Sequence, residues 1–465
     1  MSKQGLARAF DAAASTYDDN APIQRAAAER LAERIAALPL PARPRILEIG
    51  CGTGFLTQAL RRRLGPADWT VTDLSPAMLA ACRAGLGDPS DTAFRVMDGE
   101  QLQLEAGEGF DLICASLAFQ WFEDLPGALE RLSAHLRPGG WLAFATLAEG
   151  TLEEWRAAHA ELGFQAATPD FPSLRALGDM LGGRVEGERL IQAHAGGRDL
   201  LRGLKAIGAG SPAPDRRPLA PAQLKRVMAR FDANGAASSY HVAFGTLRRP
   251  DASRGVFVTG TDTGVGKTVV SACLARAWGA DYWKPVQTGL TDDEGDTVTV
   301  ARLADLPTDR LHPPRHALAA PLSPHAAAAR EGVSISLDDF TLPSSARPVV
   351  VEGAGGPLVP LNDHGLTIDL MARLDLPVVL VAANRLGAIS HTLLALDALR
   401  ARGLDVLGVV LTGAAFADNR RAIETHGKVR ILAELPYADR VDARQIADWS
   451  ALFPALDEPP WRRLG

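Results

Sequence analysis

The sequence predicts two α/β domains in series, the second of them built on a mostly parallel β-sheet. The chain has 465 residues, which is too many for one ordinary hydrophobic core. Two stretches, around residues 45–64 and 255–278, each show a short apolar run, a glycine-rich turn and then apolar residues at helical spacing. Strand, turn and helix in this order are typical of sheets covered by helices on both faces.

Composition limits the class of protein. Hydrophobic residues make up 47% of the chain and charged residues 22%, as in water-soluble globular proteins. The net charge of −6 and the lack of any basic run longer than Arg61–Arg63 argue against nucleic-acid binding. The four cysteines form no CxxC pair, and no apolar run reaches the roughly 18 residues of a membrane span. We therefore expect a cytoplasmic protein without a disulfide framework, a signal peptide or a membrane segment.

The first half begins with helical patterns. Apolar residues recur at helical spacing over residues 6–17 and 23–38, which predicts two helices before the first strand. Pro39, Pro41 and Pro44 then break the helical pattern ahead of that strand.

A glycine turn with acids around it predicts a ligand site in the first half. The residues concerned are Glu48, Gly50, Gly52, Gly54, Asp73 and Asp98. Glycines let a ligand approach the backbone closely, and an acid ending the second strand can accept hydrogen bonds from two ribose hydroxyls. The GxGxG spacing resembles class I S-adenosylmethionine-dependent methyltransferases, which have a Rossmann-like fold. The resemblance implies that these six residues form the cofactor site, with Asp73 at the ribose and Asp98 near the adenine.

Strings outside that common core narrow the resemblance. They are residues 9–17 with Ile23–Arg25, then Ser116–Trp121, Arg202–Ala209 and Ser239–His241. Together they resemble the malonyl-acyl-carrier-protein O-methyltransferase of biotin synthesis over about residues 6–247. Members of that family esterify the free carboxyl of a malonyl thioester, which hides its charge from the enzymes of fatty-acid elongation.

This reaction needs a cationic anchor more than a base. A malonyl carboxylate is already ionised at neutral pH, so methyl transfer depends on alignment and desolvation. Arg202 and Lys205 are three residues apart and are candidates for holding the carboxylate or the carrier's phosphopantetheine. The alternative is that both are solvated surface charges. Tyr17 is a candidate for closing the cofactor site.

A polar stretch with a proline, residues 248–254, is expected to link the two halves. We expect a methyltransferase domain over residues 1–247 and a second domain over residues 255–465.

The second glycine turn predicts a phosphate-binding loop. Its residues are Thr261, Asp262, Thr263, Gly264, Val265, Gly266, Lys267 and Thr268. Backbone N–H groups of such a loop converge on phosphate oxygens, the lysine adds a mobile charge and the threonine hydroxyl can ligate Mg²⁺. Gly260 stands one residue too early for the common GxxxxGK[ST] spacing.

Further apolar runs predict the strands of a P-loop NTPase α/β domain with a mostly parallel sheet. They lie at residues 282–289, 348–352, 377–382 and 406–411. Acids at strand ends beside a phosphate loop are expected Mg²⁺ ligands, so Glu352 and one acid among residues 292–296 are candidates.

Several strings together resemble dethiobiotin synthetase over about residues 254–438. They are Thr259–Thr268, Lys284–Gly289, Leu322–His325, Val351–Gly356 and Leu386–His391. The unusual glycine spacing is that family's own form. Its members close a cyclic urea from 7,8-diaminopelargonate, CO₂ and ATP through a carbamate that takes the γ-phosphate.

The resemblance implies a role for individual residues. Lys267 would neutralise the transferring phosphoryl group, and Lys284 with Thr288 would orient the carbamate. The implied Mg²⁺ ligands are Thr268, Asp296 and Glu352. Further implied binding residues are Ser323, Leu386 and Gly387 for the substrate and Glu352, Thr412 and Pro436 for the nucleotide. Since family members complete the substrate site with the partner subunit, a homodimer is implied.

Two positions depart from the family pattern. Gly264 stands where an acid is often found, and Thr412 stands where an asparagine commonly reads the adenine edge. Threonine cannot make the two hydrogen bonds of that amide, which puts nucleotide preference in question.

The two halves meet in one pathway, so the sequence predicts a bifunctional enzyme of biotin synthesis. The first alternative is a methyltransferase for another small acceptor, such as a quinone precursor. The second is a partition-type switch ATPase, which has no need of the carbamate residues Lys284 and Thr288.

Overall fold

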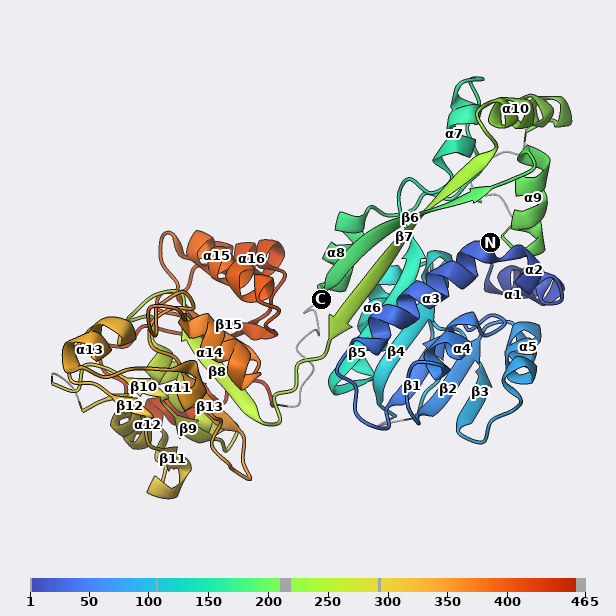
Figure 1. Cartoon of the computed structure of the whole chain (residues 1–465). Helices are drawn as coiled ribbons and strands as arrows, with labels where there is room; N and C mark the ends of the chain where they lie inside the picture. The colour runs from blue at the N-terminus through green and yellow to red at the C-terminus, as the bar shows by residue number, and fades with distance from the viewer. Residues whose placement is uncertain (1, 106–107, 210–218, 292–293, 457–465) are drawn as a thin grey trace. The chain divides into compact units, whose positions relative to one another are not determined.

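The computed structural model describes residues 2–105, 108–209, 219–291 and 294–456. The chain divides into two compact units, Met1–Arg249 and Pro250–Gly465, each with its own sheet and hydrophobic core (Figure 1). Arg248, expected to begin the linker, is the last residue of a strand. In the part of the chain that the structure describes, no helix is both long and apolar enough to cross a membrane.

The sheet of the first unit has seven strands in the order β3-β2-β1-β4-β5-β7-β6. Their bounds are β1 (Arg45–Ile49), β2 (Asp68–Asp73), β3 (Thr92–Val96), β4 (Phe110–Ser116), β5 (Leu136–Leu147), β6 (Arg184–Ala193) and β7 (Ala237–Arg248). The strands from β3 to β5 pair in parallel, whereas β7 pairs antiparallel with both β5 and β6. The sheet is therefore mixed.

Helices cover the sheet of the first unit. They are α1 (Lys3–Ala13), α2 (Tyr17–Asn20), α3 (Pro22–Ala36), α4 (Phe55–Arg61), α5 (Pro76–Leu86), η1 (Phe119–Trp121), α6 (Leu125–Ala134), α7 (Glu153–Ala160), α8 (Leu174–Leu181), α9 (Gly197–Ala206) and α10 (Pro221–Ala233). The stretch predicted as one helix over residues 6–17 is broken after Ala13. Thr16 there donates a hydrogen bond of 3.1 Å to the carbonyl oxygen of Ala206 in α9, a tertiary contact that local spacing does not encode.

The second unit is built on an all-parallel sheet of seven strands in the order β11-β9-β13-β8-β14-β15-β16. The strands are β8 (Gly255–Gly260), β9 (Asp281–Trp283), β11 (Leu311–His312), β13 (Val349–Glu352), β14 (Val378–Ala383), β15 (Val406–Thr412) and β16 (Ile431–Leu435). A separate pair consists of β10 (Val286–Gln287) and β12 (His316–Ala317). The helices are α11 (Lys267–Ala277), α12 (Asp296–Ala304), η2 (Thr308–Arg310), α13 (Pro324–Glu331), η3 (Leu337–Asp339), α14 (Thr367–Leu374), α15 (Ala388–Ala401), α16 (Ala417–Gly427) and α17 (Ala443–Ser450).

The run predicted as one strand over residues 282–289 is two short strands in two different sheets. Lys284 and Pro285 separate β9 from β10. Proline has no N–H group to continue a strand ladder, so the chain leaves the main sheet at this point. The break frees Lys284 to direct its side chain toward the loops at the sheet edge.

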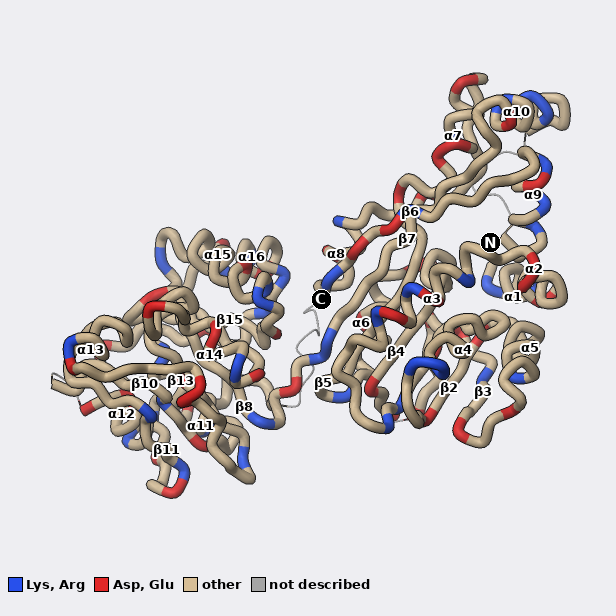
Figure 2. The backbone as a smooth tube through the Cα atoms, in the orientation of Figure 1, with Lys and Arg blue, Asp and Glu red and all other residues tan. Residues whose placement is uncertain are grey.

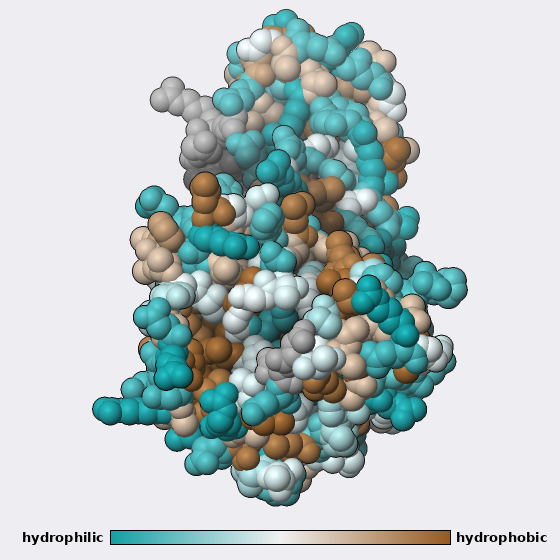
Figure 3. Space-filling view, turned by 90° about the vertical axis from the view of Figure 1, so that its left-hand side faces the viewer, coloured by the Kyte–Doolittle hydropathy of each residue, from teal (hydrophilic) through white to brown (hydrophobic). Residues whose placement is uncertain are grey.

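Each glycine turn follows a central strand. β1 lies between β2 and β4, and β8 lies between β13 and β14. Ligands of open α/β sheets bind at the carboxyl ends of such strands, where neighbouring connections leave in opposite directions. On the face drawn in Figure 3, hydrophobic residues form separate patches among hydrophilic ones.

Candidate functional sites

The glycine turn after β1 can be formed only by glycines. Gly50, Gly52 and Gly54 have φ angles of 66°, 55° and 98°, in the left-handed region that other residues rarely adopt. A Cβ atom on Gly50 would lie 2.6 Å from the Cβ of Ala118, and one on Gly54 would lie 2.8 Å from the Sγ of Cys82. The turn therefore packs against the fold on one side and presents its backbone on the other.

Asp73 is tied to the glycine turn. Its two carboxylate oxygens accept hydrogen bonds of 2.8 Å from the backbone N–H groups of Gly52 and Ser75. Burial raises the pKa of Asp73. The carboxylate at the end of β2 is thus held beside the turn, where the sequence predicts the ribose of the cofactor.

Glu48 occupies a different environment below the turn. The side chain is buried, and its Oε2 accepts a hydrogen bond of 2.7 Å from the hydroxyl of Thr57. Burial raises the pKa of Glu48 to about 8, so the carboxyl is mostly protonated at neutral pH. Thr57, the hydrogen-bond partner of Glu48, is itself buried inside the fold.

Helix α1 packs at the carboxyl edge of the first sheet. Lys3 makes ion pairs with Asp98, at 3.4 Å, and Glu100, at 2.5 Å. The ring of Phe10 meets Trp121 edge-on with a centroid distance of 5.8 Å. Asp98, expected near the adenine, therefore lies where the N-terminal helix covers the sheet edge.

Tyr17, Arg202 and Lys205 come from neighbouring elements. The Tyr17 ring lies 6.1 Å from that of Phe55, and Thr16, just before α2, hydrogen-bonds to the last residue of α9. α9 carries both Arg202 and Lys205, which are exposed. Figure 2 shows basic positions along this helix. The Arg202 guanidinium lies 3.6 Å from the carboxylate of Asp199 on the same helix.

In the second unit the phosphate loop connects β8 to α11. Gly264 and Gly266 have φ angles of 72° and 92°. Lys267 donates a hydrogen bond of 3.0 Å to the carbonyl oxygen of Asp262, so the lysine folds over the loop. Thr412, the last residue of β15, donates a hydrogen bond of 2.8 Å to the carbonyl oxygen of Val265. Its hydroxyl thus supports the loop from β15, which is separated from β8 in the sheet by β14.

A buried ion cluster lies beside the loop and joins residues far apart in the sequence. The Nζ of Lys284 lies 2.7 Å from Asp296 and 2.9 Å from Glu352. The hydroxyl of Thr268 lies 2.7 Å from Asp296 and 3.1 Å from Glu352. The structure therefore brings together four of the residues that the sequence singled out. Of the acids at 292–296, Asp292 and Asp293 lie outside the described residues.

The pKa values of Lys284 and Lys267 are shifted in opposite directions. Burial acts to lower the pKa of Lys284, but the carboxylates of Glu352 and Asp296 outweigh it and hold that pKa above its ordinary value. Burial and the positive charge of Lys284 lower the pKa of Lys267. An anion bound beside Lys267 would favour its charged form.

The cluster fits a Mg²⁺ ion in the chemistry of its donors. Mg²⁺ prefers oxygen ligands, and in phosphate-loop proteins it is held by the loop hydroxyl and an acid at a strand end. Thr268, Asp296 and Glu352 supply one hydroxyl and two carboxylates at the same place. Within the described ranges, no group of three or more His, Cys, Asp or Glu residues forms a metal site by itself.

The remaining predicted residues surround this edge of the sheet. Thr288 follows β10, and its carbonyl oxygen accepts a hydrogen bond of 2.8 Å from Gln287. Ser323 precedes α13, and its hydroxyl lies 3.1 Å from Nδ1 of His325. Leu386 is fully exposed, and Gly387 caps α15 with a φ of 89°. Pro436 is exposed just after β16.

Sequence reasoning missed three residues that contact this site. Tyr282 donates a hydrogen bond of 2.9 Å to Glu352, and alternation along β9 could have placed it on the side of Lys284. Asn419 donates a hydrogen bond of 2.8 Å to the side chain of Asn384, whose backbone N–H bonds to Thr412. No pattern in the sequence distinguishes this amide pair from surface asparagines.

Comparison with known proteins identifies both halves. A model described as a methyltransferase domain matches residues 47–142, and one described as an AAA domain matches residues 254–445. The biotin biosynthesis bifunctional protein BioCD of Bordetella avium is 55% identical over 455 residues, which cover 98% of this chain and 97% of that protein. The chain belongs to the BioCD family. Both resemblances seen in the sequence, and the two α/β folds they imply, are confirmed.

Each half of this BioCD family member also matches a shorter protein. The ATP-dependent dethiobiotin synthetase BioD of Paramagnetospirillum magneticum is 56% identical over 194 residues, 42% of this chain and 93% of its own length. The malonyl-[acyl-carrier protein] O-methyltransferase of Magnetococcus marinus is 41% identical over 243 residues, 51% of this chain and 89% of its own length.

Proposed function

We propose that the chain catalyses two reactions of biotin synthesis in the cytoplasm. The first unit methylates the free carboxyl of malonyl-acyl-carrier protein with S-adenosylmethionine. The second unit forms dethiobiotin from 7,8-diaminopelargonate, CO₂ and ATP. The observation that carries this proposal is the 55% identity to one bifunctional protein over 98% of the chain. Residues 250–254 would then serve only to connect the two enzymes.

In the methyltransferase unit, the chain's own residues position the reactants. Gly50, Gly52 and Gly54 offer open backbone to the methionine part of the cofactor, and Asp73 is oriented for its ribose. When bound, S-adenosylmethionine supplies the methyl group. Arg202 and Lys205 on α9 hold the malonyl thioester by its charge. No base is required, because the carboxylate is already ionised.

In the synthetase unit, Lys267 turns from Asp262 to the phosphates of ATP and neutralises the transferring group. Thr268, Asp296 and Glu352 hold Mg²⁺, which supplies charge for the phosphates when bound. Lys284 orients the carbamate oxygen toward the γ-phosphate together with Thr288. The carbamate oxygen takes the γ-phosphoryl group and ADP leaves. The second amine then attacks the carbonyl carbon and loses a proton, and phosphate leaves as the ring closes.

We also propose a homodimer of the second unit. The substrate carboxylate would bind backbone N–H groups at the start of α15, where Gly387 caps the helix. Leu386 and Leu394 at this end of the unit are large apolar side chains that are exposed in the single chain. A second copy would cover them.

The full-length protein tests the synthetase directly. It is incubated with diaminopelargonate, bicarbonate, Mg²⁺ and ATP, and dethiobiotin is measured by mass spectrometry. We expect product from the native chain, none from Lys284→Ala and none when Mg²⁺ is chelated. ATP hydrolysis without dethiobiotin would favour the switch ATPase instead.

A parallel assay with labelled S-adenosylmethionine tests the methyltransferase. We expect methylation of malonyl-acyl-carrier protein and none of acetyl-acyl-carrier protein, which lacks the free carboxyl. Methylation of a quinone precursor without malonyl methylation would contradict the proposal.

A further inference from the structure

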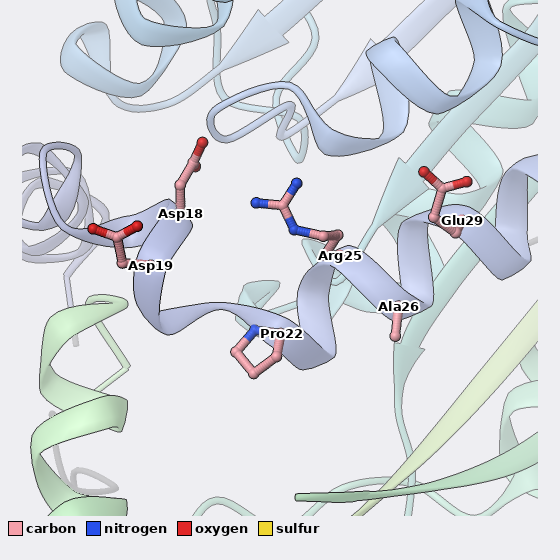
Figure 4. A pocket seen from close by; sticks show the side chains of 6 residues that line it. All are labelled: Asp18, Asp19, Pro22, Arg25, Ala26 and Glu29. Carbon is pink, nitrogen blue, oxygen red and sulfur yellow. The ribbon is translucent and has the colours of Figure 1, made fainter.

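A cavity of about 390 Å³ opens beside helices α2 and α3 of the first unit. Its lining consists of Asp18, Asp19, Pro22, Arg25, Ala26 and Glu29 (Figure 4). None of these residues belongs to the cofactor pattern that the sequence indicated. Four of the six carry a charge, so the cavity suits a polar ligand.

Arg25 joins this cavity to the glycine turn. Its guanidinium carbon lies 4.2 Å from the ring centroid of Phe55, the residue that follows Gly54 and begins α4. The Tyr17 ring lies 6.1 Å from the same ring, and a Cβ on Gly52 would lie 4.0 Å from the Tyr17 ring. Arg25 thus stands at the end of the surface along which the cofactor's methionine part is expected.

The guanidinium of Arg25 is available to an anion. Among the residues that the structure describes, the side chain of Arg25 makes no hydrogen bond or ion pair, and its guanidinium stacks on Phe55. Stacking uses the flat face of a guanidinium and leaves its N–H edge free to bind a carboxylate through two bonds. In Figure 4 the Arg25 side chain points away from the ribbon of its own helix, toward the side of the cavity where Asp18 lies.

The acids of the cavity differ in their availability. Glu29 is neutralised by ion pairs with Arg62 and with Arg63, the latter at 2.8 Å. Asp18 and Asp19 are exposed and, within the described part of the chain, have no ion pair. The cavity therefore offers an unpaired cation and unpaired anions, which complement a zwitterionic amino-acid group better than a simple anion.

We propose that Arg25 binds a ligand carboxylate at the end of the glycine turn, and that this carboxylate is the α-carboxylate of S-adenosylmethionine. The inference rests on the proposed methyl-transfer function. The malonyl carboxylate of the substrate has the same chemistry and is the other possible source.

The test measures binding of two cofactor analogues to the full-length protein by calorimetry. S-adenosylhomocysteine has the amino-acid end, whereas 5′-methylthioadenosine lacks it. We expect Arg25→Gln to weaken the binding of S-adenosylhomocysteine about tenfold to a hundredfold, because a charge-assisted bidentate contact is lost. The affinity for 5′-methylthioadenosine should change by less than about twofold. Arg25→Lys should recover part of the affinity. Arg43→Gln, which removes an exposed arginine paired with Asp68, is the matched control.

Other outcomes would contradict the assignment of Arg25 to the cofactor in different ways. If analogue binding is unchanged but KM for malonyl-acyl-carrier protein rises about tenfold, the carboxylate is the substrate's, and the assignment to the cofactor is overturned. If neither quantity changes, Arg25 binds no carboxylate and the proposal fails. If Arg25→Gln weakens the binding of both analogues equally, the role of Arg25 is structural and the proposal fails. If the native chain binds neither analogue, the proposed methyltransferase function itself fails.

Discussion

The hydroxyl of Tyr282 donates a hydrogen bond of 2.9 Å to Oε2 of Glu352, whose Oε1 faces Lys284. Tyr282 is completely buried, so this hydroxyl fixes the rotation of the carboxylate from behind. Groups that orient a metal ligand in this way commonly matter for metal affinity.

Tyr282→Phe removes only that hydroxyl and should loosen the Glu352 carboxylate. We expect the Mg²⁺ concentration for half-maximal dethiobiotin synthesis to rise about tenfold, with Mn²⁺ binding weakened in parallel. Tyr240→Phe, a similarly buried tyrosine of the other unit, is the control. Unchanged Mn²⁺ binding in Tyr282→Phe would show that the hydrogen bond does not orient a metal ligand.

Burial of Glu48 should make the stability of the first unit fall as pH rises. Its pKa is about 8 in the folded protein and about 4.5 for an ordinary glutamate, so between these values the folded state binds the extra proton. The contribution of this proton to the free energy of unfolding, on the order of a few kcal/mol, is lost progressively as the pH rises from 4.5 to 8. Glu48→Gln keeps the shape without the ionisation. Urea unfolding at pH 5 and pH 8.5 should show a smaller pH dependence in the variant, and equal dependence would contradict the assignment.

Thr412→Val removes the hydrogen bond to Val265 but keeps the shape of the side chain. The phosphate loop should become less well ordered, and KM for ATP should rise about threefold to tenfold, as expected for one neutral hydrogen bond. Thr392→Val deletes a buried hydroxyl within α15 and is the matched control. Steady-state kinetics of the synthetase measures this KM. An unchanged KM for ATP would mean that the loop keeps its form without the Thr412 hydroxyl.

Arg202→Gln and Lys205→Gln test the two candidate anchors on α9. Each should raise KM for malonyl-acyl-carrier protein about tenfold and leave the melting temperature unchanged, because both side chains are exposed. Arg198→Gln changes an exposed charge on the same helix and serves as the comparison. Equal kinetics for all three variants would mean that Arg202 and Lys205 are solvated surface charges.

Much of the second site was predictable because its residues stand directly after strands. Glu352 ends β13 and Thr268 opens a helix after β8, and parallel strands bring their carboxyl ends to one edge. The sequence singled out Lys284 and the two acids but did not predict that they touch, since this contact depends on the strand break at Pro285.

Other features depend on contacts between distant segments. The break after Ala13 follows from packing against α9. The availability of Arg25 depends on where Asp18, Asp19 and Glu29 lie in space, since none of them forms an ion pair with Arg25 in the described part of the chain. Local periodicity carries no information on either. The pKa of Glu48 likewise depends on burial and on two helices that follow its strand, where Cys82 raises this pKa and the hydrogen bond from Thr57 lowers it.

The chain passes from one enzyme to the other between β7 and β8, and among the described strands none belongs to both sheets. A gene could therefore be divided at this point without removing a strand from either sheet, which agrees with the separate proteins that match each half. Joined in one reading frame, the two catalysts are made in a fixed one-to-one ratio. A change in the transcription of such a gene then alters both activities together.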